Sequence, residues 1–241
     1  MQEMHEPLLE VRGLTMKFGA LCANQDISFD VFPGEIIGLI GPNGAGKTTC
    51  FNCVTGLLHP TQGSVRFDGT DITRWAPYDI ARLGLVRTFQ IVHTFCDMTV
   101  TENVVTSAFL RTRSAKEAFA KADKAIELTG LGSLRDRLAL GLTIADRKRL
   151  EIARVFATEP RLIMVDEVSL GLMPTMVDRV LQVLHEIRDR GVTVLMVGQK
   201  VEKALAMVDR AYMPQTGKIA MSGAGRELLE SPDIRRAYLG L

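Results

Sequence analysis

The sequence predicts an α/β fold in which a mostly parallel sheet is joined by an antiparallel β layer and a helical lobe. Short, continuously apolar segments alternate with helical patterns, as in a buried parallel sheet covered by helices. Segments near the N-terminus instead alternate apolar and polar side chains, as half-buried antiparallel strands do. Between residues 99 and 157 no strand pattern is present, which indicates a separate helical unit.

The N-terminal half supplies the antiparallel layer and the first buried strand. Residues 9–17 and 27–31 are predicted as antiparallel strands, and residues 35–40 as a buried parallel strand. A helix is predicted from residue 46 to about 56, and the strand 64–67 ends at an Asp68-Gly69 turn. A short helix is predicted to begin at Pro77 and to end at Gly84.

The remaining elements follow from capping and turn signals. Thr99 with Glu102, and Ser114 with Glu117, have the spacing of capping boxes. Further predicted elements are a strand at 161–165, a helix at 174–190, a strand at 192–197, a hairpin at 212–221 and two short C-terminal helices. We expect one domain over residues 7–241, with core and β layer at 7–90 and 160–241, a lobe at about 91–159, and a flexible tail at 1–6.

Bulk properties exclude several classes of protein. Of the 241 residues, 46% are hydrophobic and 24% charged, and the net charge is +1, so no electrostatic attraction to nucleic acid is expected. No apolar stretch reaches the roughly 18–20 residues that span a bilayer, and the N-terminus does not resemble a signal peptide. Cys50 and Cys53 lack a second pair to complete a zinc site, so they are expected to be core residues. We expect a cytoplasmic protein that reaches a membrane only by docking onto other subunits.

One glycine-rich segment fits the pattern G-x-x-x-x-G-K-[ST]: Gly41, Pro42, Asn43, Gly44, Ala45, Gly46, Lys47, Thr48 and Thr49. It follows a predicted buried strand and begins a predicted helix, which is the context in which this pattern binds phosphate. Glycines let backbone N–H groups approach phosphate oxygens, and the helix N-terminus adds a positive dipole end. The ammonium of Lys47 is expected to reach the β- and γ-phosphates, and the hydroxyl of Thr48 to bind Mg²⁺.

Two acids follow the predicted strand at 161–165. Asp166 at the strand end is expected to hold Mg²⁺ through water, and Glu167 to polarise the attacking water. Together with the glycine-rich segment, these acids define a P-loop NTPase core. A kinase, a helicase and a GTPase all remain open on these two motifs alone.

The P-loop variant resembles that of ABC ATPases, and the resemblance extends along nearly the whole chain. It implies the ABC ATPase fold, ATP and Mg²⁺ as cofactors, and a dimer with nucleotides between its subunits. Phe18 stands where the family stacks an aromatic ring on adenine, Gln90 at the magnesium-sensing Q-loop glutamine, and Gln199 at the catalytic switch histidine. The D-loop corresponds to residues 169–172. The signature segment, which contacts the partner's nucleotide, corresponds to Leu142, Thr143, Ile144, Ala145 and Asp146.

A closer resemblance is to the ATPases of branched-chain amino-acid importers. It is carried by residues 69–73, 80–90, 98–104 and 236–240. It implies uptake of branched-chain amino acids or related small polar solutes such as amides or urea, at the inner face of the cell membrane. The implied partners are a second ATPase subunit, two membrane permeases and, indirectly, a periplasmic or extracellular solute-binding protein, with no nucleic acid.

The signature segment departs from the family's Leu-Ser-Gly-Gly-Gln. Ile144 and Ala145 replace glycines, Asp146 replaces an amide, and Gln199 replaces the switch histidine. ATP binding is expected to be retained, whereas the dimer is open to being homomeric or heteromeric. Near a partner's polyphosphate the charge of Asp146 would cost on the order of 2 kcal/mol at an effective dielectric of about 20. Alternatively, Asp146 points away and caps its own helix.

Two other functions compete with transport. Soluble ABC ATPases that act on ribosomes or DNA usually carry two nucleotide domains or long coiled-coil insertions, and this sequence has neither. A small-molecule kinase would need a substrate lid, and it would leave Gln90 and the signature segment unexplained.

Overall fold

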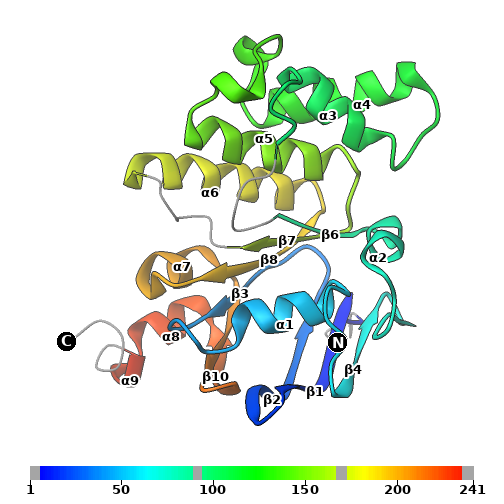
Figure 1. Ribbon diagram of the computed structural model, residues 1–241. Helices are drawn as coiled ribbons and strands as arrows, with labels where there is room; N and C mark the ends of the chain where they lie inside the picture. Colours follow the sequence, from blue (N-terminus) through cyan, green and yellow to red (C-terminus); the bar gives the residue numbers. More distant parts are fainter. Residues whose placement is uncertain (1–5, 89–93, 167–172, 235–241) are drawn as a thin grey trace.

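A computed structural model describes residues 6–88, 94–166 and 173–234, and its elements form two sheets with a group of helices beside them (Figure 1). The larger sheet has six strands in the order β10-β9-β3-β8-β7-β6. They are β3 (Ile36–Ile40), β6 (Leu85–Arg87), β7 (Leu162–Asp166), β8 (Thr193–Gly198), β9 (Arg210–Gln215) and β10 (Lys218–Ala224). From β9 to β6 the neighbours run parallel, whereas β10 pairs antiparallel with β9.

The central strands of this sheet are buried along their whole length. Every residue of β3, β7 and β8 is buried, which explains why their sequences are continuously apolar. The predicted strands at 35–40, 161–165 and 192–197 are confirmed, as is the hairpin of β9 and β10. The edge strand β6 was not predicted, because three residues are too few to carry a period.

The second sheet is antiparallel, in the order β2-β1-β4-β5. Its strands are β1 (Leu9–Phe18), β2 (Leu21–Val31), β4 (Gln62–Phe67) and β5 (Thr70–Asp71). The predicted start of the second strand at residue 27 is wrong, because β2 begins at Leu21 and pairs with β1 from the Phe18–Leu21 turn onward. Small and polar side chains dominate residues 22–26, so this part of β2 lacks the alternation by which strands are predicted.

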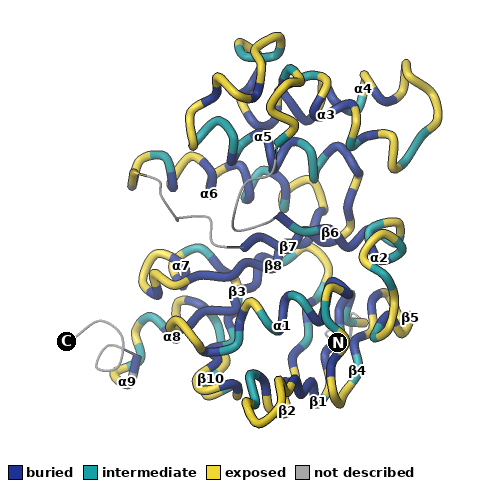
Figure 2. Tube along the Cα trace, viewed as in Figure 1, coloured by how far each residue is buried: buried dark blue, intermediate teal, exposed yellow. Residues whose placement is uncertain are grey.

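Helices cover both faces of the six-stranded sheet. On one side α1 (Lys47–Val54) lies between the two sheets and shares a core with β1, β2, β3 and β4. The opposite face packs against α6 (Pro174–Asp189), α7 (Val201–Met207), α8 (Gly225–Glu230) and α9 (Pro232–Ile234). Figure 2 shows this as a buried centre of β3, β7 and β8 with exposed residues on the surrounding helices. Both cysteines of α1, Cys50 and Cys53, are in the core, and burial raises the pKa of the Cys53 thiol to about 11.

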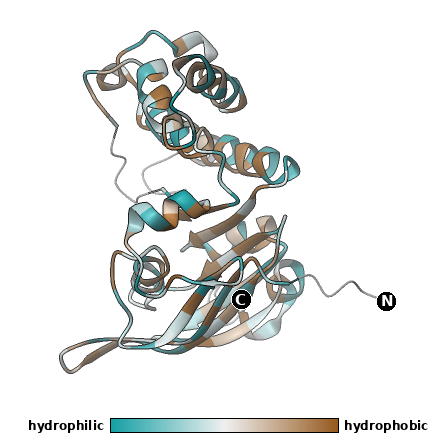
Figure 3. Ribbon diagram, turned by 90° about the vertical axis from the view of Figure 1, so that its right-hand side faces the viewer, coloured by the Kyte–Doolittle hydropathy of each residue, from teal (hydrophilic) through white to brown (hydrophobic). Residues whose placement is uncertain are grey.

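The described part of the lobe contains the α-helices α3 (Val100–Ala108), α4 (Ala115–Leu128) and α5 (Ile144–Phe156), with short 3-10 helices at Gly132–Leu134 and Ala139–Gly141. They have a hydrophobic cluster of their own, and Figure 3 shows them standing at the end of the molecule away from the antiparallel sheet. The predicted capping box at Thr99 is confirmed in both of its hydrogen bonds. The box at Ser114 is only half formed, because the carboxylate of Glu117 accepts from the Thr112 hydroxyl instead.

A short helix, α2 (Pro77–Leu83), connects the antiparallel sheet to β6 and begins and ends where predicted. Across the described ranges, no helix has the length and apolar character that crossing a membrane requires.

A single buried side chain, Asn103, organises the start of the lobe. Its amide oxygen accepts from the Phe95 backbone N–H at 2.9 Å, and its amide nitrogen donates to the carbonyls of Phe95, Met98 and Thr99 at 3.0, 3.2 and 2.9 Å. Asn103 is fully buried. The segment 95–99 is therefore held to α3 by side-chain bonds.

We expect Asn103→Ala to lower the free energy of unfolding by about 2–3 kcal/mol, because buried backbone groups left without partners cost about 1–3 kcal/mol. Chemical denaturation measures the loss, and amide hydrogen exchange should accelerate at residues 95–99. Thr106→Ala on the exposed face of α3 is the control and should change stability by less than about 0.5 kcal/mol. Unchanged exchange at 95–99 would contradict this role of Asn103.

Candidate nucleotide site

The P-loop connects β3 to α1, and two of its glycines lie close to the backbone of neighbouring strands. Gly46 precedes the first residue of α1 and has φ +91°, a conformation that disfavours any side chain. A Cβ atom on Gly46 would lie 2.5 Å from the Ala23 carbonyl oxygen, and one on Gly41 would lie 2.5 Å from that of Pro214. Packing therefore requires glycine at both positions, and backbone geometry requires it at Gly46 as well.

An open cavity of about 710 Å³ lies over this loop. P-loop residues 43–49 line it together with Gln199, which follows β8. The ammonium of Lys47 is buried and donates to the carbonyls of Gly41 and Pro42 at 2.7 Å each. Thr48 is exposed toward the cavity at the first turn of α1. The structure thus brings Gln199, distant in sequence, to the same cavity as the phosphate-binding pattern.

Phe18 lies beside this cavity rather than among its lining residues. It ends β1 with 47% of its surface exposed, and its cross-strand partner Leu21 does line the cavity. An exposed ring at this position has space to stack on a planar base.

Sequence reasoning missed several lining residues. These are Leu21, Cys22 and Ala23 at the start of β2, and Thr216 and Gly217 in the turn between β9 and β10. No local signal could have found them, since they reach the cavity only because β2 and β9–β10 pack around the P-loop. A structural trace of this packing is the bond from the Gln25 N–H to the Gly217 carbonyl, at 2.7 Å.

Asp166 ends β7 and is almost fully buried, with 1% of its side chain exposed. One carboxylate oxygen, Oδ2, is 3.0 Å from a guanidinium nitrogen of Arg87, while Oδ1 has no hydrogen-bond donor among the described residues. Burial raises the pKa of Asp166, and the charge of Arg87 is the largest influence opposing that rise. A carboxylate and the Thr48 hydroxyl are hard oxygen ligands, which suit Mg²⁺. The orphaned Oδ1 is the atom that such an ion or its bound water would satisfy.

Two predicted site residues, Glu167 and Gln90, lie outside the described residues, as do residues 169–172 of the predicted D-loop. Their roles stay predictions.

The signature segment lies in the lobe, at the start of α5. Thr143 caps this helix, accepting from the Asp146 N–H at 3.1 Å and donating its hydroxyl to Asp146 Oδ2 at 2.7 Å. The other oxygen of Asp146 is paired with Arg149. Partial burial opposes ionisation of Asp146, but the bonds from Thr143 and Arg149 outweigh it and hold the pKa of Asp146 below its ordinary value.

Of the two interpretations of Asp146, this geometry favours the helix cap. Its negative charge is compensated by Arg149 within the same turn, so the repulsion expected near a polyphosphate is reduced. Leu142 is buried and Ile144 is 64% exposed. None of residues 142–146 lines the P-loop cavity, so the structure does not bring the signature segment and the P-loop together within one chain.

Known proteins resemble this chain over most of its length. The family model described as ABC transporter matches residues 24–169. The chain is 37% identical to the high-affinity branched-chain amino acid transport ATP-binding protein LivG of Escherichia coli K12, covering 98% of this chain and 99% of the relative. It is also 37% identical to the similarly named BraF of Pseudomonas aeruginosa, with the same coverage.

A solved structure shows the same fold. The ADP conformation of MJ1267, an ATP-binding cassette of an ABC transporter, matches with a TM-score of 0.87 at 29% identity, covering 98% of this chain and all of that one. The predicted α/β class with a P-loop core is thereby confirmed.

Lys47→Ala should weaken binding of a fluorescent ATP analogue by at least about tenfold, because a hydrogen bond to a charged group contributes about 1.5–3 kcal/mol. Fluorescence anisotropy measures the affinity, and circular dichroism checks that the fold is retained. Lys218→Ala, on the exposed start of β10, is the matched control and should bind as the parent protein does. Binding within twofold of the parent for Lys47→Ala would rule out the P-loop as the phosphate site.

Proposed function

This chain belongs to the ABC transporter family of ATP-binding proteins, and on that premise we propose that it powers the uptake of branched-chain amino acids or related small polar solutes, such as amides or urea, through partner permeases. The observation that carries the proposal is the match to LivG and BraF over 98% of the chain. Neither relative's name refers to ribosomes or DNA, so neither supports the competing function in which the ATPase acts on them.

The cavity over the P-loop supports specific roles for the residues that line it and for the predicted site residues outside its lining. The P-loop N–H groups and the Lys47 ammonium would hold the phosphates, and the exposed Phe18 ring would stack on adenine. Thr48, Asp166 and Gln90 would hold Mg²⁺, which would neutralise charge on the transferring phosphoryl group. Glu167 would orient and polarise the attacking water, and Gln199, which lines the cavity, would act in the same step.

The division of labour within the chain follows from the two units described above. We propose that residues 7–241 act as one ATPase domain, in which the core (7–90 and 160–241) binds the nucleotide and the lobe (about 91–159) presents its signature segment to a second subunit. Because the P-loop cavity and the signature segment are separated within one chain, a complete site needs two chains. The second chain is either a copy of this one or a different ATPase.

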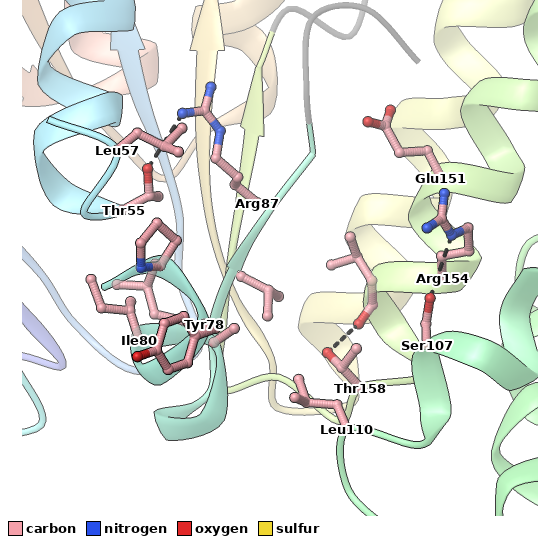
Figure 4. A pocket seen from close by; sticks show the side chains of 15 residues that line it. Thr55, Leu57, Tyr78, Ile80, Arg87, Ser107, Leu110, Glu151, Arg154 and Thr158 are labelled. Atoms are coloured by element: carbon pink, nitrogen blue, oxygen red, sulfur yellow. Dashed lines mark hydrogen bonds between the residues drawn. The ribbon is translucent and has the colours of Figure 1, made fainter. Parts of the chain in front are cut away.

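A groove between core and lobe suits the permease. This groove, of about 440 Å³, is lined mainly by apolar atoms, and its walls include Thr55, Leu57, Tyr78, Leu110, Arg154 and Val155. Figure 4 shows Leu57 and Tyr78 on the core wall facing Leu110 and Arg154 on the lobe wall. Tyr78 and Leu57 are exposed large hydrophobic residues, as a docking surface requires. A permease bound here would place the protein at the inner face of the membrane, with a solute-binding protein beyond it.

Glu167→Gln should keep ATP binding and lose hydrolysis by about 10²–10⁴-fold, because a general base contributes about that much to the rate. Phosphate release measures the turnover, and anisotropy of a fluorescent ATP analogue measures the binding. Glu186→Gln, on α6, is a control that should hydrolyse ATP normally. Normal turnover by Glu167→Gln would mean that another residue activates the water.

The permease should lie against the groove and the residues preceding the lobe. Single cysteines at Phe95, Asp97 and Met98, in a background where Cys22 and Cys96 are serine, should crosslink to permease loops in the assembled complex. Cysteines at Thr216 and Lys218 are the control positions and should not crosslink. Crosslinks from the β9–β10 hairpin alone would reverse the proposed orientation.

The signature segment should limit ATP-driven dimerisation of the isolated protein, because Ile144 and Ala145 block close backbone approach and the Thr143 hydroxyl is engaged by Asp146. Replacing residues 143–146 with Ser-Gly-Gly-Gln in a Glu167→Gln background should increase the ATP-dependent dimer by roughly tenfold or more, as one freed charge-assisted hydrogen bond permits. Light scattering measures the dimer fraction. No gain after the replacement would remove the main support for pairing with an unlike subunit.

A further inference from the structure

Arg87, the last residue of β6, occupies the boundary between two functional regions of the core. Its side chain is 8% exposed, and it lines the groove between core and lobe. Its guanidinium also reaches Asp166, which ends the neighbouring strand β7. Through one side chain, Arg87 therefore connects the groove to Asp166, the proposed Mg²⁺ ligand.

The guanidinium of Arg87 links its own strand, β6, to β7 and to the P-loop helix α1. One nitrogen is 3.0 Å from Asp166 Oδ2 on β7, and the other is 2.7 Å from the Asn52 amide oxygen and 3.4 Å from the Thr55 hydroxyl on the P-loop helix and its cap. The Phe51 ring lies 5.8 Å from the guanidinium carbon, within cation–π range. A planar fork with five donors can make these contacts together, whereas the point charge of a lysine could not.

This arrangement gives the two oxygens of Asp166 different surroundings. Oδ2 is fixed by Arg87, and Oδ1 is left without a donor among the described residues. A carboxylate anchored through one oxygen presents the other in a fixed direction, which is how outer partners orient metal ligands. The residues present thus fit a divalent cation at Oδ1, directly or through a water.

The groove side of Arg87 faces charge from the lobe. In Figure 4 Arg87 stands on the core wall, while Glu151 and Arg154 of α5 stand on the opposite wall. Burial lowers the pKa of Arg87 and of Arg154; for Arg87 the lowering is opposed first by Asp166 and then by Glu151, and for Arg154 by Glu151. Glu151 is itself paired with Lys148 at 2.8 Å. A permease segment that enters the groove would change the surroundings of the guanidinium that anchors Asp166. A movement of α5 would do the same.

We propose that Arg87 is a positioning residue that orients the Asp166 carboxylate for Mg²⁺ and couples that orientation to the state of the groove between core and lobe. The coupling to a permease rests on the proposed function, whereas the orientation of Asp166 does not. Because Arg87 is not among the residues that line the P-loop cavity, its contribution should be confined to the metal-dependent part of nucleotide binding.

The first experiment separates metal-dependent from metal-independent binding. In a Glu167→Gln background, the affinity for a fluorescent ATP analogue is measured with Mg²⁺ and with a chelator. We expect Arg87→Gln to reduce the affinity gained from Mg²⁺ by about 10–100-fold, the usual cost of losing an outer partner of a metal ligand. Affinity in the chelator should stay within about twofold. Arg87→Lys, which keeps the charge but not the fork, should recover part of the loss and also tests the idea if Arg87→Gln folds poorly.

Arg210→Gln is the matched control. Arg210 makes a two-nitrogen ion pair with Glu35, at 2.9 Å for each bond, and is not among the residues that line the P-loop cavity or the groove. Its loss should lower the melting temperature without changing the Mg²⁺ dependence. Equal loss of affinity with and without Mg²⁺ in the Arg87 variants would make Arg87 a purely structural residue and overturn the proposal, as would an unchanged Mg²⁺ dependence.

The second experiment tests the coupling without a permease. Leu57→Cys, in the background lacking Cys22 and Cys96, carries an environment-sensitive fluorophore on the groove wall. Mg²⁺ added with ATP should shift its emission, and Arg87→Gln should abolish the shift while Arg210→Gln preserves it. An equal shift in the Arg87→Gln protein, or no shift in the parent, would overturn the coupling. Failure of the permease crosslinks alone would contradict the docking site and leave the link from Arg87 to Asp166 intact.

Discussion

The close approach of three backbones at the P-loop is the constraint on which the rest of this structure depends. Gly46 packs under the Ala23 carbonyl of the antiparallel sheet, and Gly41 packs against Pro214 of the β9–β10 hairpin. The buried Asn24 amide adds a bond of 3.1 Å to the Gly46 carbonyl. A turn that binds phosphate with backbone N–H groups must hold them in fixed directions. Here that rigidity comes from packing two separate β units onto one loop, which also builds the walls of the cavity.

The buried charged side chains near the boundary of core and lobe are held in ion pairs. Arg87 with Asp166, and Lys148 with Glu151, are both nearly buried pairs near the boundary of core and lobe. Breaking such a pair leaves a buried charge uncompensated and is costly. The boundary between core and lobe therefore contains charges that respond to rearrangement. An energy-coupling ATPase needs such responsive groups between the site of chemistry and the site of docking.

The P-loop cavity and the signature segment differ in how many elements contribute to them. Around the P-loop, the cavity gathers residues from β2, α1, the end of β8 and the β9–β10 turn. At the signature segment, Asp146 is bonded by Thr143 three residues before it and by Arg149 three residues after it, within the first two turns of α5. A helix cap that is satisfied internally is stable by itself, but it has fewer donors to offer a second subunit. This inequality is the structural basis for considering an unlike partner.

The sequence by itself determined the elements whose signals are local. The buried strands β3, β7 and β8, the helix start at Lys47 after Gly46 and the capping box at Thr99 each depend on residues close together in the chain. Tertiary structure alone decided which distant residues meet. Leu21–Ala23, Gln199 and Thr216 line one cavity, and Arg87 reaches Asp166, because sheet order places β6 beside β7 and β9 beside β3. It also decided that Asp146 is paired rather than free, since a side chain's charge is visible in the sequence but its partner depends on packing.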